Sequence, residues 1–228
     1  MRDRPTFELS EFLRYLAAHD EAENGGFPSL TGLSTELGIS VASLREQLEV
    51  ARALGLVEVK PRVGIRRLPF NFHPAVQQSL GYAIELDEQY FNIFADLRKH
   101  IEAAYWHEAV KLLTEEDQTQ LQSIIDRAWL KLKGSPIQIP HEEHKRLHLI
   151  IYKRLNNPFV SGILEAYWEA YEAIGLNVFT DYIYLKEVWQ YHEKMVDSIR
   201  TEEYDEGYRA LMEHADMLSE RLDLRPIK

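Results

Sequence analysis

The sequence predicts a mainly α-helical protein in two parts. An N-terminal part of three helices and a small β-hairpin precedes a C-terminal all-α bundle of six or seven helices. Two observations lead to this fold class. Apolar residues recur at three- and four-residue steps through most of the chain, and from residue 76 onward no strand-like alternation interrupts that pattern. We therefore expect one domain over residues 1–68, a linker over 69–75 and a second domain over 76–228.

Composition limits the classes of protein to which this chain can belong. Its 228 residues are 45% hydrophobic and 28% charged, which is enough to bury a core but includes no apolar run of membrane-spanning length. The first twenty residues carry charges throughout and have no signal-peptide pattern. The absence of cysteine excludes thiolate ligands and cysteine nucleophiles. These features predict a cytoplasmic protein without a membrane partner.

Three helices are expected in the N-terminal part. The first covers residues 7–19, and the second covers 30–37 and ends before Gly38, a residue suited to the left-handed position after a helix. Ser40 is the natural N-cap of the third helix, and Gly55 stops it.

A basic hairpin is expected next, over residues 56–67, with Gly64 in its tight turn. Residues 60–67 contain four basic side chains and no acidic one, although the whole chain has a net charge of -11. Helix, turn, helix and basic hairpin in this order are typical of a winged helix-turn-helix on double-stranded DNA. The alternative is a helical hairpin with a β-turn that packs against the larger domain.

The third helix would present its first turn to the major groove, where arginine can read guanine or contact phosphate. The residues expected to contact DNA are Ser40, Ala42, Ser43 and Arg45 on this helix, and Arg62, Gly64 and Arg66 on the hairpin.

Helical periodicity continues through the C-terminal part. The expected helices cover residues 75–84, 86–113, 115–132, 140–155, 159–174, 182–200 and 203–222. A bundle core of this kind is a common place for a ligand or metal site.

Four histidines of the bundle are candidates for one site. His144 and His148 lie four residues apart and so share a helix face. His192 and His214 are equidistant from residue 203, where a turn between two antiparallel helices is expected, so they should lie at the same height. Separate surface or core histidines are the alternative, and we assign the other five to that class: His19, His73, His100, His107 and His141.

Residues 36–67, ELGISVASLREQLEVARALGLVEVKPRVGIRR, resemble the pattern of GntR regulators over a match that covers residues 10–67. The matching positions are Gly38, Ser40, Arg45, Glu46, Leu48, Gly55, Leu56, Val57 and Gly64. Val41 and Ala42 replace polar residues of the family, so specificity should depend more on Arg45 and the hairpin. The resemblance implies a homodimer that places two readers on a palindromic operator.

The segments HKRLHLIIYKRLNNPFV and WQYHEKMVDSIRTEEYDEGYRALMEH resemble the C-terminal (FCD-type) domain of the FadR subfamily. In metal-binding members an aspartate and three histidines hold a divalent ion, which carries over to His148, His192 and His214. His144 occupies the aspartate position. Imidazole in place of carboxylate favours Zn or Ni over Mg or Mn. Two alternatives stay open: His144 is not a ligand, or the site holds no metal.

Arg98 lies in LRKHIEAA, which is similar to the R-x-x-L-E-x-x-A helix of the same family. A guanidinium beside a bound cation suits a small organic-acid effector, with one end chelated and the other paired to arginine. The alternative is a solvated helix arginine.

The predicted function is a transcriptional regulator controlled by such an effector. A metal-free regulator that responds to an acyl-CoA-like effector is the second interpretation, and a metal-dependent enzyme is the third. Catalysis is disfavoured because Lys145 stands where the zincin helix needs a glutamate, and because the chain has no G-x-S-x-G, P-loop or G-x-G-x-x-G.

Overall fold

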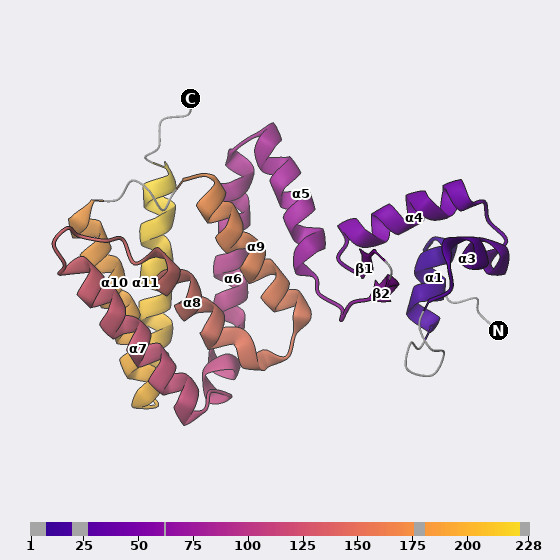
Figure 1. Ribbon diagram of the computed structural model, residues 1–228. Coiled ribbons are helices and arrows are strands. Elements are labelled where there is room, and N and C mark those ends of the chain that lie inside the picture. Colours follow the sequence, from indigo (N-terminus) through magenta and orange to yellow (C-terminus); the bar gives the residue numbers. More distant parts are fainter. Residues whose placement is uncertain (1–7, 20–26, 62, 176–180, 224–228) are drawn as a thin grey trace, which may run out of the picture. The chain divides into compact units, whose positions relative to one another are not determined.

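The structure is a computed structural model that describes residues 8–19, 27–61, 63–175 and 181–223. The chain divides into two compact units, Met1–Ala75 and Val76–Lys228. The first contains helices and a two-stranded sheet, and the second contains helices alone among its described residues (Figure 1). The predicted fold class, mainly α with a winged N-terminal unit and an all-α bundle, is confirmed.

Three helices of the N-terminal unit lie within the described residues: α1 (Glu11–Ala18), α3 (Leu30–Leu37) and α4 (Val41–Ala53). Each begins at a serine whose side chain accepts a backbone N–H of the first turn. Their inward faces form one core with the hairpin, made of Phe12, Leu16, Leu33, Leu44, Leu48, Ala51, Val57 and Ile65. Helix α1 is shorter than expected because Ser10, in an extended conformation, caps it at Glu11.

Two glycines shape the connections around α4. Gly38 has a φ of 66°, the left-handed conformation that ends α3. Gly55 has a φ of 67°, and a Cβ atom there would come within 2.6 Å of Pro74 Cγ. Any other residue at position 55 would therefore be strained by its backbone and by its neighbour.

The hairpin consists of β1 (Val57–Lys60) and β2 (Gly64–Arg67), paired antiparallel. Its register places Glu58 opposite Arg66 and Lys60 opposite Gly64. Because side chains alternate along a strand, Val57 and Ile65 share the face that packs on the core, whereas Glu58, Lys60 and Arg66 lie on the opposite face.

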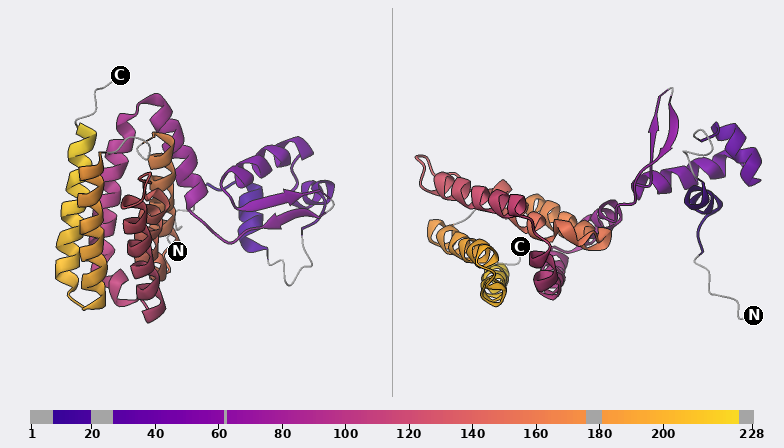
Figure 2. Two further views of the ribbon diagram at one scale, coloured as in Figure 1. Left: turned by 60° about the vertical axis from the view of Figure 1, so that its left-hand side comes forward. Right: turned by 90° about the horizontal axis from the view of Figure 1, so that it is seen from below.

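The bundle contains seven α-helices among the described residues. They are α5 (His73–Leu86), α6 (Gln89–Lys111), α7 (Glu115–Leu132), α8 (His141–Tyr152), α9 (Pro158–Ala173), α10 (Tyr182–Arg200) and α11 (Tyr204–Asp223). Helices α10 and α11 lie side by side, and α6 contacts α8, α9 and α11 (Figure 2). Trp106, Trp189 and Leu147 lie in the larger apolar core.

Most expected helix boundaries agree with the structure within about two residues, and local hydrogen bonds explain the exceptions. Helix α6 begins at Gln89 rather than at residue 86 because the Asp87 carboxylate accepts the Gln89 N–H at 2.9 Å. Helix α8 ends at Tyr152, and a 3-10 turn, η1 (Lys153–Leu155), follows it. Helix α5 begins at His73, inside the range expected to be a linker.

Helix α11 crosses its neighbours closely at Gly207. A Cβ atom at this position would overlap Ser198 Oγ of α10 and would lie 2.6 Å from Trp106 Cζ2 of α6. Glycine thus allows α11 to approach both helices, and it lies two turns before His214.

Among the described residues, no helix combines the length and apolar character that a membrane crossing requires.

Candidate functional site

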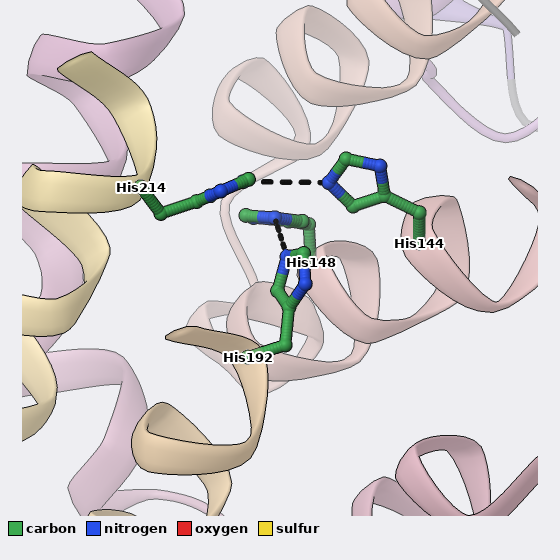
Figure 3. Close-up of side chains that lie close together, drawn as sticks. All are labelled: His144, His148, His192 and His214. Atoms are coloured by element: carbon green, nitrogen blue, oxygen red, sulfur yellow. Dashed lines mark hydrogen bonds between the residues drawn. The ribbon is translucent and has the colours of Figure 1, made fainter. Parts of the chain in front are cut away.

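Four imidazoles meet in the core of the bundle. His144 and His148 extend from α8, His192 from α10 and His214 from α11, and their rings converge (Figure 3). The Nε2 atoms of His148 and His192 are 3.1 Å apart, and those of His144 and His214 are 3.4 Å apart. One ligand nitrogen from each ring lies within 4.8 Å of the other three. The structure thus brings together all four histidines selected from spacing.

Local geometry explains this convergence. Residues four apart on α8 project from one face. The chain reverses after Arg200, where Thr201 N bonds to Asp197 O and Glu202 adopts a φ of 62°. This turn near residue 203 brings α11 back along α10 and places His214 beside His192, with ring centroids 4.4 Å apart.

Three of the four imidazoles are shielded from water. His148 and His192 are fully buried and His214 is 2% exposed, whereas His144 is half-buried. Burial is the main cause that lowers the pKa of all four imidazoles, and the neighbouring histidines lower those of His144, His192 and His214 further. Neutral imidazole is the form that coordinates metals.

A buried ion pair on α6 contacts the ring of His148. Arg98 Nη2 lies 2.8 Å from Glu102 Oε2, and both side chains are at most 2% exposed. Glu102 Oε1 lies 3.0 Å from His148 Nδ1, and Arg98 Nη2 lies 2.8 Å from the same ring nitrogen. Burial alone would raise the pKa of Glu102, but Arg98 and His148 outweigh it and hold that pKa below its usual value. Glu102 is therefore ionised.

Arg98 is buried rather than solvated, so the alternative interpretation of this residue is wrong. Its guanidinium lies over the rings of Tyr167 and Trp168, 4.6 and 5.4 Å from their centroids. The Arg98 Nε atom has no hydrogen-bond partner among the described residues.

The recognition helix expected from the sequence is α4. Ser40 caps it by accepting the Ser43 N–H at 3.1 Å. Ala42 and Arg45 are exposed on the first two turns, and Arg45 forms no ion pair with any residue that the structure describes. Gln47, which the sequence analysis did not select, accepts the Phe12 N–H at 2.9 Å and so ties α4 to α1.

The hairpin carries fewer free cations than its sequence suggests. Arg67 Nη1 donates to the carbonyls of Leu16 and His19 at the end of α1, at 3.3 and 2.8 Å. Lys60 Nζ lies 2.9 Å from Glu58 Oε1, and Arg66 lies 3.9 Å from the same atom.

Two more hairpin residues were expected to contact DNA. Gly64 has a φ of 92°, as its tight turn requires. Arg62 lies outside the described residues.

Among the described residues, the five remaining histidines do not join this group of possible metal ligands. Three of them have acidic partners: His100 with Asp96, His107 with Asp205 and His141 with Glu172. The sequence analysis missed Glu102 as part of the site. The signal available was its position four residues after Arg98, which places both on one face of α6.

Comparisons with known proteins agree with this architecture. The family model described as the FCD domain matches residues 94–217, more than half of the chain. A comparison with curated protein sequences finds no match. Among solved structures, "Streptococcus agalactiae GntR" has a TM-score of 0.67 at 14% identity and covers 92% of this chain and 98% of its own. "E. coli McbR/YncC" has a TM-score of 0.50 at 18% identity, over 94% of this chain and 98% of its own.

At these identities the solved structures show the fold alone, whereas the family match extends through the helices that carry all four histidines. The chain therefore belongs to the FCD-domain family.

Proposed function

We propose that this chain is a GntR-type transcriptional regulator that binds a palindromic operator as a homodimer, and that a small carboxylate effector at a histidine-ligated metal controls its affinity for DNA. Residues 1–68 read the operator, residues 69–75 connect the two parts, and residues 76–228 bind the effector and dimerise. The observation that carries the proposal is the convergence of four imidazole nitrogens, three of them from buried side chains and one from the half-buried His144, within 4.8 Å of one another.

The donor set fits a divalent ion. Zinc–imidazole bonds of about 2.0–2.1 Å place tetrahedral ligand nitrogens roughly 3.3–3.4 Å apart. The two Nε2 pairs, at 3.1 and 3.4 Å, are close to this separation. An all-imidazole set favours Zn or Ni, as His144 in place of the aspartate of the family suggests.

An effector can reach the ion only if the coordination number exceeds four. A tetragonal Ni²⁺, or a Zn²⁺ that expands to five ligands, provides that position. Arg98 is the second anchor in this proposal, because its Nε–H is available while Nη2 contacts Glu102 and His148. A carboxylate would then bind the metal through one oxygen and the guanidinium through the other.

Metal content of the protein purified without a His tag tests the site. We expect about one Zn²⁺ or Ni²⁺ per chain by elemental analysis, and a loss of that metal in His192→Ala. His100→Ala is the matched control, because His100 is exposed and pairs with Asp96 outside the cluster. Far less than one metal per chain after reloading with either ion would refute the metal site.

The same protein preparation can distinguish the metal-dependent mechanism from the second interpretation, a metal-free pocket for an acyl-CoA-like effector. Fluorescence anisotropy on an inverted repeat from the upstream region of the gene would measure operator affinity with organic acids and with acyl-CoA. An organic-acid response that a chelator abolishes supports the metal-dependent mechanism. A response to acyl-CoA that survives the chelator supports the metal-free one.

An exposed apolar stripe on α6 supports self-association. Tyr90, Ile93 and Leu97 follow one another at three- and four-residue steps and so share a face. They are 46, 59 and 45% exposed. Isologous packing of such a stripe is the usual way in which a homodimer buries it.

A further inference from the structure

Two oppositely charged groups compete for one nitrogen of His148. The Nδ1 atom lies 2.8 Å from Arg98 Nη2, which can only donate, and 3.0 Å from Glu102 Oε1, which can only accept when ionised. A neutral imidazole satisfies one of these partners. If Nδ1 accepts from Arg98, the proton is on Nε2 and that nitrogen cannot bind a metal. If Nδ1–H donates to Glu102, the Nε2 lone pair faces His192.

The buried Glu102 carboxylate needs the hydrogen bond to His148 Nδ1 more than Arg98 does. Glu102 is 1% exposed, and its Oε2 has no aligned hydrogen bond although Arg98 Nη2 lies 2.8 Å away. Without the His148 proton, neither oxygen of this buried carboxylate would have an aligned donor, and Oε1 would face a second lone pair at 3.0 Å. Arg98 has five N–H donors, so it loses much less by giving up one contact.

We infer that Glu102 is a positioning residue that fixes His148 in the Nδ1–H tautomer and so aims its Nε2 lone pair into the cluster. This inference rests on the proposed metal site and deepens it. Carboxylates that accept the second N–H of a ligating histidine fix its tautomer and ring orientation, and their removal typically lowers metal affinity by about 10–100-fold. The contact with Arg98 is then an ion pair to Glu102, which holds the carboxylate in place.

Two-bond ¹H–¹⁵N correlation spectra of the metal-free full chain report which ring nitrogen of His148 carries the proton. We expect Nδ1–H in the wild type. In Glu102→Gln, the amide oxygen is expected to accept from Arg98 and the NH₂ group to face Nδ1, which moves the proton to Nε2. The matched control is Glu108→Gln, an exposed position of the same helix, which should leave the tautomer unchanged.

Zinc(II) titration against a chromophoric chelator is the second measurement, with a loss of about 10–100-fold expected for Glu102→Gln and none for Glu108→Gln. Nε2–H in the wild type, or an unchanged tautomer or zinc affinity in Glu102→Gln, would overturn the inference. A wild type that binds no zinc or nickel refutes the metal site instead, and the tautomer spectra then decide the role of Glu102 separately.

Discussion

Replacing Gly207 by alanine is expected to destabilise the bundle and to disturb the histidine cluster together. The new Cβ would overlap Ser198 Oγ and would lie 2.6 Å from Trp106 Cζ2. Favourable carbon–carbon contacts are about 3.5–4.0 Å, so α11 would have to move by roughly 1 Å. Neither neighbour can easily yield, because both are buried and hydrogen-bonded, Trp106 to Tyr204 O and Ser198 to Met195 O, each at 2.8 Å.

The magnitude follows from two opposing effects. Overpacking a closed core typically costs about 1–3 kcal/mol, and two pinned neighbours place this site at the upper end. Alanine returns about 1 kcal/mol through its higher helix propensity. The net loss in the free energy of unfolding is therefore expected to be about 2 kcal/mol. Because His214 lies two turns further along the same face, the shift of α11 should also weaken zinc binding.

Urea unfolding and zinc titration of the variant measure both effects. Gly81→Ala is the matched control, since Gly81 lies within α5 and a Cβ there meets no described atom within 4 Å. The control should gain about 0.5–1 kcal/mol from helix propensity alone. A Gly207→Ala protein as stable as the wild type, with unchanged zinc affinity, would refute the argument that close packing of α11 sets the geometry of the cluster.

Other substitutions test the remaining parts of the molecule. Arg154 holds the pKa of the buried Asp117 carboxyl below its usual range. The wild type should therefore be more stable to unfolding than Asp117→Asn above about pH 4, where the carboxyl is ionised in both the folded and the unfolded chain. This difference in stability should be lost as the pH falls toward the lower folded-state pKa. By pH 3 that advantage should have narrowed by about 1 kcal/mol, and urea midpoints at pH 7 and pH 3 would show whether it does. Arg45→Ala should weaken operator binding and reduce the slope of log affinity against log salt by about one, and an unchanged slope in anisotropy titrations would exclude a phosphate contact. Ile93→Glu should yield a monomer in analytical ultracentrifugation, whereas Leu130→Glu, at a more exposed position outside the α6 stripe, should not; a dimeric Ile93→Glu protein would rule the stripe out as the interface.

Local sequence determined the elements and two pairs of histidines. Helical periodicity and caps such as Ser40 act over a few residues, so most helix boundaries could be predicted within about two residues from the sequence. His144 and His148 share a face because of their spacing alone. His192 and His214 meet because they are equidistant from one turn, and this too is visible in a linear sequence.

The surroundings of those histidines depended on tertiary structure. Glu102 reaches His148 across 46 positions of sequence, and nothing in the periodicity of α6 shows that its Arg98–Glu102 pair faces α8 rather than solvent. Arg67 was counted among the hairpin cations, but it binds carbonyls at the end of α1 that only packing brings within reach. Sequence alone therefore determined which residues could be ligands, because spacing along a helix sets the direction of a side chain. The packing of α6, α8, α10 and α11 decided which groups hold those ligands, because contacts between helices depend on side-chain shape at their crossings, such as Gly207 against Trp106.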